Sequence, residues 1–582
     1  MMETIYCGKQ AFDFKNGVPA GLSVQLVSEN DGVSVYEFVL DAPEETGGIS
    51  FILRYPMLGI LSVYSPTMAR DRSVHQWFGG STAVSNFYFG APVLAALKDG
   101  NRNLSTLALS DAVNDCSIRF YVNDFEEKET VEFYVTLLTG VIKKKRYRVQ
   151  LRVDSRDIPM EYVMKDVSAW WGAFYPDRPA LPEGAEDPLY SSWYNFHQHP
   201  TQDKLLEELQ VAAQMGFKTV ILDDGWQIAG HGTGDYRMCG DWEVSKDKFY
   251  DFRRFVEDVH SLGMKIMLWF SLPFVGLDHP YYEKFKDNML YYREGALMCG
   301  ILDPRYASVR EHMIGILCRY VQEFGLDGFK LDFLDAIAMM PETPPANDDM
   351  DEPDLSQAII RLLTDAQTRL QAIHPSLLIE YRQNYVGPAI NRFGHMLRVG
   401  DCAFESQTNR IGIADLRLLS YNVAVHSDML YWAKSETPEN CARQLLNTLF
   451  AVPQISVLLT NSTEEQRRVI RYYLQYWMEN RDVLLHGDFH PGAMDFLYPT
   501  LEATTVSHRV VAQYLPGCVK LDERSLHVFN ATAEEGLLLD NTNGAARAGV
   551  IVNCFGEQTN FTVTANAIIR CPIPSGGHIE LL

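Results

Sequence analysis

The chain has 582 residues, of which 47% are hydrophobic and 22% are charged. This mixture is typical of a globular protein and, at this length, predicts a large central domain with smaller domains attached. The 51 Lys and Arg residues against 75 Asp and Glu residues give a formal net charge of −24, which disfavours nucleic acid and anionic membrane surfaces as partners.

The sequence contains no apolar run of the kind that a signal peptide or a membrane helix needs. Its ten cysteines are widely spaced, from Cys7 to Cys571, without the paired spacing of zinc or redox motifs. We therefore expect a cytoplasmic protein with free and mostly buried thiols.

Residues 1–172 contain short alternating or aromatic-rich runs that are separated by Gly, Pro, Asn and Asp. This pattern predicts an N-terminal antiparallel β-sandwich. The expected strands are Ser23–Val27, Val33–Leu40, Ile49–Arg54, Thr106–Leu109, Ser117–Val122, Val131–Leu138 and Arg146–Val153. Residues 173–188 are rich in proline and are predicted to form a linker.

Residues 189–485 change to a strand-like run followed by a helix-like run, repeated eight times. Units of this size predict an α/β fold with a central (β/α)8 TIM barrel. The expected strands are Ser191–Phe196, Thr219–Asp223, Lys265–Phe270, Gly328–Phe333, Leu377–Tyr381, Met396–Val399, Ser427–Tyr431 and Gln454–Leu459. The expected helices are Thr201–Met215, Asp251–Leu262, Val309–Phe324, Leu355–Ile373, Ile413–Val423, Ala442–Phe450 and Glu464–Asn480.

Residues 486–582 return to strand patterns and predict a small C-terminal antiparallel β domain. Its expected strands are Val506–Gln513, Ser525–Asn530, Gly549–Asn553 and Gln558–Val563.

Charged and aromatic residues follow several predicted barrel strands, at the end where such barrels carry their active sites. The segments are Asp223-Asp224-Gly225-Trp226, Trp269-Phe270, Lys330-Leu331-Asp332, Glu380-Tyr381-Arg382-Gln383 and Arg398-Val399-Gly400-Asp401. Carboxylates that point into one cavity are costly to desolvate unless they bind or react with something. Taken alone, the aspartate pair is also typical of a strand-to-helix turn, Lys330 and Asp332 of a structural ion pair, and Trp269 of a core aromatic residue.

In their order and spacing these motifs resemble glycoside hydrolase family 36, the α-galactosidases of clan D. The resemblance also includes Ser192-Trp193-Tyr194-Asn195, Gly240-Asp241-Trp242, Leu302-Asp303-Pro304 and His426. It implies a β-sandwich, a catalytic barrel and a C-terminal β domain. It further implies retaining cleavage of terminal α-linked galactosides, with Asp332 as the nucleophile and Asp401 as the acid/base.

Retention requires two carboxyl groups about 5 Å apart, one ionised and the other protonated near neutral pH. Lys330 lies two residues before Asp332 on the same strand face, so we expect its ammonium group to hold Asp332 ionised and to donate to a sugar hydroxyl. Negative neighbours and partial burial are expected to raise the pKa of Asp401.

The resemblance implies that Asp223 and Asp224 bind sugar hydroxyls and that Trp193, Trp226 and Trp269 form aromatic walls, with Trp77 as a lid from the first domain. Arg382 and Arg398 bring two cations toward the site. They favour either a substrate with an anionic substituent or, as the preferred interpretation, simple balance of the acids. His197 and His199 alternate as two metal ligands would, but no third spaced ligand is evident and clan D chemistry needs no metal, so we expect no metal and no cofactor.

The sequence departs from the family pattern in three places. Ser271-Leu272-Pro273 follows the third strand, Glu380–Gly387 replaces the stretch that reads the 2-position of the sugar, and Gly400-Asp401-Cys402 surrounds the acid/base. The reaction type therefore carries over better than the substrate. An α-N-acetylgalactosaminidase, a transglycosylase like the raffinose synthases and a non-catalytic sugar-binding barrel remain alternatives. The expected partners are an oligosaccharide or glycoside substrate and, by analogy with relatives, further copies of the chain.

Overall fold

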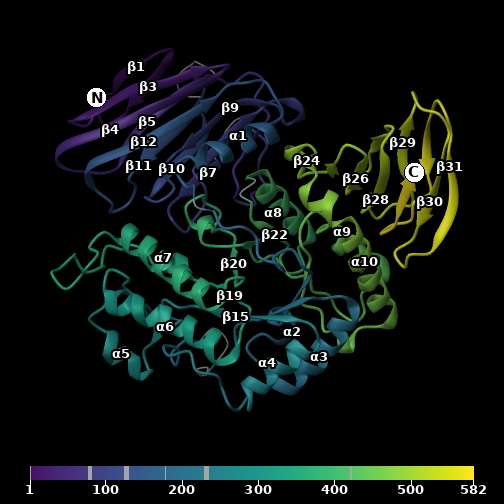
Figure 1. Ribbon diagram of the computed structural model, residues 1–582. Coiled ribbons are helices and arrows are strands. Elements are labelled where there is room, and N and C mark those ends of the chain that lie inside the picture. The colour runs from purple at the N-terminus through teal and green to yellow at the C-terminus, as the bar shows by residue number, and fades with distance from the viewer. Residues whose placement is uncertain are drawn as a thin grey trace.

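The computed structural model describes residues 2–75, 81–123, 130–176, 178–227, 235–295, 297–419 and 422–581. Three groups of sheets follow one another along the chain (Figure 1). In this view the purple N-terminal sheets lie at the upper left, and the yellow C-terminal sheets lie at the right of a central ring of strands and helices. Among the described residues, no helix is both long and apolar enough to span a lipid bilayer.

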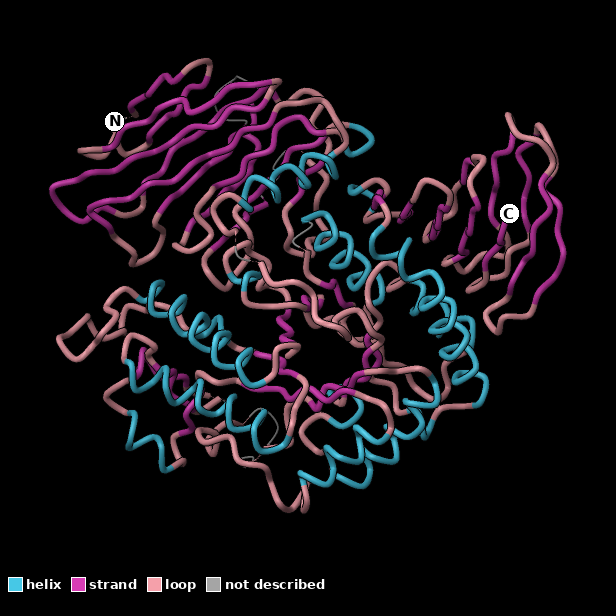
Figure 2. Tube along the Cα trace, viewed as in Figure 1, coloured by secondary structure: helices cyan, strands magenta, loops and turns pink. Residues whose placement is uncertain are grey.

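An eight-stranded parallel sheet, in the order β22-β21-β20-β19-β15-β14-β13-β23, forms the centre of the molecule. Isolated parallel bridges join His426 to Val452 and Leu430 to Ile455 and so connect the two end strands. The predicted TIM barrel is therefore confirmed, and Figure 2 shows its strands inside a ring of helices. The barrel strands are β13 (Leu189–Ser191), β14 (Thr219–Leu222), β15 (Lys265–Phe270), β19 (Gly328–Leu331), β20 (Leu378–Arg382), β21 (Met396–Arg398), β22 (Ala424–His426) and β23 (Gln454–Ile455).

Helices cover the outside of the barrel, and side-chain caps fix where several of them begin. The Asp354 carboxylate accepts the backbone N–H groups of Ser356 and Gln357, so helix α7 covers Leu355–Ile373, as predicted. Thr463 and Gln466 form a reciprocal capping box at the start of α10. The barrel helices are α2 (Trp193–Phe196), α3 (Gln202–Met215), α4 (Phe252–Ser261), α5 (Pro280–Phe285), α6 (Ala307–Phe324), α7, α8 (Ser406–Leu419), α9 (Pro438–Leu446) and α10 (Glu464–His486).

Two barrel strands lie earlier in the chain than predicted. The first strand ends at Ser191, and Trp193–Phe196, which was expected to be part of it, forms the helical turn α2. The backbone N–H of Tyr194 donates to Ser456 Oγ at 2.9 Å, a tertiary contact that overrides the strand propensity of this aromatic segment. The seventh strand is Ala424–His426 instead of Ser427–Tyr431, because β22 takes its register from β21.

Two stacked six-stranded antiparallel sheets form the N-terminal β-sandwich that the sequence predicts. Their inner faces enclose a separate hydrophobic core. One sheet has the order β1 (Glu3–Cys7), β2 (Gln10–Phe14), β5 (Ile49–Pro56), β11 (Thr130–Leu137), β10 (Cys116–Asn123), β7 (Ser81–Ser85). The other has the order β3 (Leu22–Asn30), β4 (Val33–Thr46), β12 (Lys144–Asp154), β9 (Asn103–Leu109), β8 (Val93–Leu97), β6 (Ser62–Tyr64).

The C-terminal domain is mainly antiparallel, as predicted, but the pairs β26–β28 and β27–β29 are parallel. Its larger sheet has the order β24 (Asp488–Pro491), β25 (Thr500–Thr504), β26 (His508–Gln513), β28 (Ser525–Asn530), β33 (His578–Leu581), β30 (Arg547–Val552), β31 (Gln558–Val563). The smaller sheet has the order β27 (Cys518–Lys520), β29 (Leu537–Asn541), β32 (Ala567–Cys571).

Several elements have no counterpart among the predicted ones. Helix α1 (Met160–Gly172) ends the sandwich segment and contacts α8. A three-stranded sheet of β16 (Phe274–Gly276), β18 (Cys299–Leu302) and β17 (Met289–Arg293) is inserted between β15 and α6. Short 3-10 turns are η1 (Asp99–Asn101), η2 (Leu334–Ala336), η3 (Ile390–Arg392), η4 (Leu459–Asn461) and η5 (Met494–Phe496).

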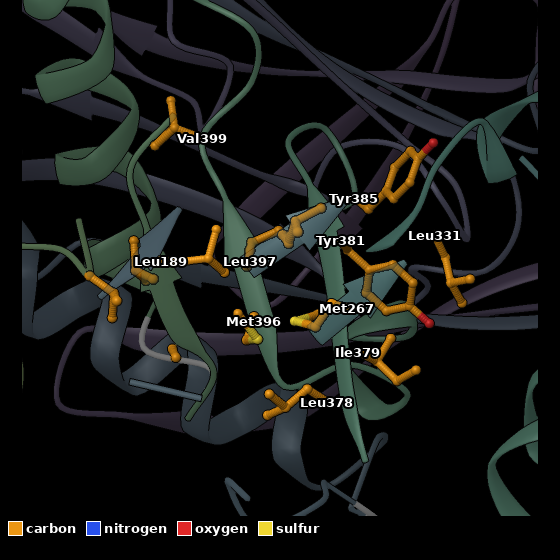
Figure 3. Packing of buried hydrophobic residues seen from close by; sticks show 14 of the residues in the cluster. Leu189, Met267, Leu331, Leu378, Ile379, Tyr381, Tyr385, Met396, Leu397 and Val399 are labelled. Atoms are coloured by element: carbon orange, nitrogen blue, oxygen red, sulfur yellow. The ribbon is translucent and has the colours of Figure 1, made fainter. Parts of the chain in front are cut away.

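The lower interior of the barrel is apolar. Figure 3 shows Met267, Leu378 and Met396 among the barrel strands. Each lies two residues before Trp269, Glu380 or Arg398, and alternation along a strand places each pair on the same face. An apolar layer thus supports a polar layer, and the polar layer lies toward the carboxyl ends of the strands.

A buried ion pair joins the three domains. Arg72, from the sandwich segment, donates to both carboxylate oxygens of Asp415 on α8, at 3.0 and 2.6 Å. Tyr498, from the C-terminal segment, donates from its hydroxyl to Asp415 at 2.9 Å. The Arg72 and Asp415 side chains are 1% and 0% exposed. Because both charges are desolvated, each depends on the other.

We expect Asp415→Ala to lower the free energy of unfolding by about 3–5 kcal/mol, because it leaves Arg72 buried without its ionic partner. The exposed pair of Glu311 and Arg369 offers a matched control, and Glu311→Ala should cost less than about 1 kcal/mol. Thermal unfolding of the three proteins measures both effects. Equal stability of the two variants would contradict a stabilising role for the buried pair.

Candidate active site

Asp332 directly follows β19 and is 8% exposed. Arg382 Nε donates to its Oδ1 at 2.5 Å, Trp269 Nε1 donates to its Oδ2 at 3.1 Å, and the backbone N–H of Phe333 donates to Oδ1 at 2.8 Å. Burial alone would raise the pKa of Asp332, but the charges of Arg382 and Lys330 outweigh it and hold the pKa below its usual value. Asp332 is therefore an ionised carboxylate at neutral pH.

Lys330 forms its direct ion pair with Asp223. Its Nζ donates to Asp223 Oδ2 at 2.6 Å, and both side chains are buried. Lys330 still lowers the pKa of Asp332 through its charge, but the direct ionic partner of Asp332 is Arg382. The expectation that the charge of Lys330 helps to keep Asp332 ionised agrees with this lowered pKa. The alternative, a direct ion pair between Lys330 and Asp332, is not what the structure has, because the ammonium group bonds to Asp223.

Both arginines at this end of the barrel contact carboxylates. Arg382 Nη2 lies 3.8 Å from Asp335 Oδ1, in addition to its bond to Asp332. Arg398 Nη2 donates to Asp401 Oδ1 at 2.8 Å, and its Nη1 donates to Asp428. Each guanidinium group thus lies beside at least two acids, and Arg398 Nε is also 4.0 Å from Glu380 Oε1. This arrangement fits the interpretation that the arginines balance the charge of the acids.

The pKa of Asp401 contradicts the expectation from the sequence. Its side chain is 63% exposed. Desolvation at the barrel mouth would raise its pKa, as expected, but Arg398 and then Lys330 and Arg382 outweigh this effect and lower the pKa to about 2. The sequence shows the acids but not which arginine each of them contacts, so the predicted increase is wrong for the protein without substrate.

The aspartate pair after β14 divides between two environments. Asp223 faces Lys330, as described above. Asp224 accepts hydrogen bonds from Gln198 and Gln227 at 2.5 and 2.6 Å and from the Tyr236 hydroxyl at 2.9 Å. Burial raises the pKa of Asp224, and the three donors lower it only in part. Asp224 thus joins the side chains of Gln198, Gln227 and Tyr236, whereas Asp223 belongs to the ionic network of the site.

The predicted aromatic walls have different positions. Trp226 is fully buried and its Nε1 donates to the Trp269 carbonyl at 2.9 Å, so it packs in the core instead of lining the site. Trp269 is 2% exposed but contacts Asp332 directly. Trp193 is partly exposed, with its ring 5.2 Å from that of His197. Trp77 lies outside the described residues.

Two further acids belong to the network, although the sequence alone assigned them no role. Asp428 is fully buried and accepts the Tyr194 hydroxyl at 3.0 Å and the Cys402 backbone N–H at 2.8 Å. Glu380 is fully buried on β20, two residues before Arg382. Asp428 lies two residues after His426, and Glu380 lies two residues before Arg382. Because side chains alternate along a strand, this spacing is the signal that places both acids on the inner face of the barrel. The described residues include no group of three or more His, Cys, Asp or Glu side chains arranged to hold a metal ion.

Known proteins with related sequences are α-galactosidases. Residues 179–389 match the sequence model of the family Melibiase. Alpha-galactosidase 2 of Pediococcus pentosaceus is 27% identical over 199 residues, which cover 33% of this chain and 27% of that protein. Alpha-galactosidase Mel36A of Lactobacillus acidophilus is 24% identical over 229 residues, which cover 39% of this chain and 28% of that protein. The chain therefore matches little more than a quarter of the length of these curated relatives.

Solved structures resemble the chain over almost its whole length. The family 36 α-galactosidase AgaA of Geobacillus stearothermophilus, in complex with raffinose, has a TM-score of 0.65 over 99% of this chain and 83% of that chain, at 14% identity. The α-galactosidase of Lactobacillus brevis has a TM-score of 0.63 over 100% and 83%, at 13% identity. At this identity the similarity shows a shared fold.

The lowered pKa of Asp332 predicts a pH-dependent contribution to stability. A depressed carboxylate pKa stabilises the native state above about pH 4, the unfolded pKa, and this contribution disappears as the pH falls through the native pKa. Arg382→Met should therefore lower the melting temperature at pH 7, with a difference from wild type that narrows below about pH 4. Arg369→Met, which removes an exposed arginine, is the control. A pH-independent difference would contradict the Arg382–Asp332 linkage.

Proposed function

We propose that this chain is a retaining glycoside hydrolase of family 36 that cleaves terminal α-linked galactosides, in line with its similarity to the Melibiase sequence model and to α-galactosidases. The observation that carries this proposal is the pairing of two carboxylates with two neighbouring arginines. Arg382 and Arg398 are register partners on the adjacent strands β20 and β21. Arg382 bonds to Asp332 and Arg398 bonds to Asp401, so each of the two carboxylates is held by an arginine on one of these adjacent strands.

In the proposed reaction Asp332 attacks the anomeric carbon while Asp401 donates a proton to the departing oxygen. A covalent galactosyl ester of Asp332 results. Asp401 then takes a proton from water, which attacks the anomeric carbon from the face that the leaving group occupied. Two inversions give overall retention. Trp269 Nε1 donates to Oδ2 of Asp332 and so orients the carboxylate. The carboxylate stays ionised and can act as the nucleophile.

The buried charges support binding of a neutral sugar. Asp223 and Lys330 form a buried ion pair, and we propose that their remaining polar atoms make charge-assisted hydrogen bonds to ring hydroxyls. Arg382 and Arg398 already contact acids, which argues against a requirement for an anionic substituent. We therefore propose a galactoside, such as an oligosaccharide with a terminal α-galactose, as the substrate.

We also propose that the protein works in the cytoplasm. All ten cysteines are free and six of them are buried, which suits a reducing compartment. Assembly into a homo-oligomer stays a prediction from the family resemblance.

Asp332→Asn should reduce turnover of an aryl α-galactoside by several orders of magnitude, because it removes the nucleophile. Asp327→Asn is the matched control. Asp327 lies just before β19, at the opposite end of the strand, where its carboxylate accepts the Ile266 backbone N–H at 2.8 Å. We expect that variant to retain activity. Wild-type rates in Asp332→Asn would contradict the assignment of the nucleophile.

Azide separates the two proposed roles by product configuration. In Asp401→Ala, azide should attack the galactosyl ester and yield α-galactosyl azide, whereas in Asp332→Ala it should attack the substrate directly and yield β-galactosyl azide. Proton NMR of the products from an activated aryl α-galactoside distinguishes the two anomers. The reverse pattern would exchange the roles, and inverted products from the wild type would rule out retention.

A further inference from the structure

Glu380 is enclosed in the polar layer of the barrel, below the proposed catalytic carboxylates. Its side chain is fully buried. Its Oε2 accepts a hydrogen bond from Gln454 Nε2 at 2.5 Å, whereas its Oε1 has no hydrogen-bond partner among the described residues. Buried carboxyl oxygens are normally hydrogen-bonded, so an oxygen without a partner calls for an explanation.

The nearest cation to this oxygen is Arg398. Arg398 Nε lies 4.0 Å from Glu380 Oε1 and likewise has no hydrogen-bond partner in the described part of the chain. The other two nitrogens of the same guanidinium group donate to Asp401 and Asp428. One buried arginine is therefore shared by three carboxyl groups, and Asp401 is the one with an exposed side chain.

Among the residues that the structure describes, the other groups around Glu380 do not supply a second free cation. Lys330, its register partner on β19, donates to Asp223. His426 on β22 donates from Nε2 to the Ala185 carbonyl oxygen at 2.7 Å. Burial lowers the pKa of His426 to about 4, so this side chain is neutral at neutral pH. Burial raises the pKa of Glu380 to about 7, despite the opposing charges of Arg398 and Lys330. Glu380 therefore changes its charge near neutral pH.

We propose that Glu380 controls the proton of Asp401 through the arginine that they share, an inference that rests on the proposed acid/base role of Asp401. When Glu380 is ionised, it competes for Arg398, and Asp401 then binds a proton from water more readily. When Glu380 is protonated, Arg398 acts fully on Asp401 and keeps it ionised. No proton passes directly from Glu380 to Asp401. Glu380 releases its proton to solvent, and Asp401 takes its proton from water.

The coupling is reciprocal, as required for two sites that share one charge. Protonation of Asp401 leaves Arg398 available to Glu380 and favours the ionised glutamate. The pair therefore tends to hold one proton in total. Glu380 is a positioning residue in this scheme, since its buried carboxyl group lies below the site and acts through Arg398.

Glu380→Gln tests the inference because glutamine keeps the size of the side chain but cannot ionise. Asp401 should then be harder to protonate, so the basic limb of the kcat/KM profile for raffinose should move to lower pH by about one unit, which is a tenfold loss of rate on that limb. Turnover of 2,4-dinitrophenyl α-galactoside, whose leaving group needs little protonation, should change much less. An equal loss with both substrates would overturn the inference.

Glu208→Gln is the matched control. Glu208 is also fully buried, but it accepts the Tyr190 hydroxyl at 3.0 Å and the Thr460 backbone N–H at 3.2 Å instead of approaching Arg398. Its substitution should affect stability without changing the ratio of rates for the two substrates. If both variants changed the ratio of the two rates to a similar extent, the effect of Glu380→Gln would come from a general disturbance of the barrel, and the inference would be overturned.

An infrared titration tests the coupling without any substrate. The wild type should show a carboxylic-acid carbonyl band that titrates near neutral pH and is absent from Glu380→Gln. In Asp401→Asn the same band should titrate about one unit lower, because Arg398 is then shared by one fewer charge. An unshifted band would overturn the inference. Absence of galactosidase activity in the wild type would instead overturn the proposed function, and the titration would still decide the coupling.

Discussion

The contact between Arg398 and its carboxyl neighbours is the interaction on which the barrel mouth depends. Carboxylates withdrawn from water are stable only beside a cation or in protonated form. Arg398 supplies that cation to Asp401, Asp428 and Glu380, whereas Arg382 serves Asp332 on the adjacent strand. The positions of the two proposed catalytic carboxylates therefore depend on Arg382 and Arg398, which are register partners on adjacent strands.

Much of this architecture follows from the sequence, because its signals are local and periodic. Helix α7 is predicted to the residue from an apolar repeat, and Asp332 is found because it directly follows a fully buried strand. The short strands β13 and β22 are displaced, since three residues carry too little periodicity to fix a position. Lys330 and Asp223 come from strands that are separated by β15 in the sheet, and Arg398 reaches Asp401 across a turn. Residue order does not identify such partners.

The same distinction explains why the fold is better defined than the substrate. Solved family 36 structures align with nearly the whole chain, but the matched sequence covers only a third of it or slightly more. A barrel tolerates wide sequence change as long as inward and outward positions keep their character. Recognition of a particular sugar depends on single side chains, which a shared fold does not identify.

The buried contact of Arg72, Asp415 and Tyr498 has a consequence for the modularity of the protein. Each of the three domains contributes one member, so no pair of domains contains the complete set. Without the sandwich, the barrel would keep Asp415 but lose its ionic partner Arg72. Without the C-terminal sheets, it would lose the Tyr498 hydroxyl that donates to Asp415. A recombination event that transfers only one of these domains to another protein would therefore break this contact, whereas transfer of all three domains together would keep it.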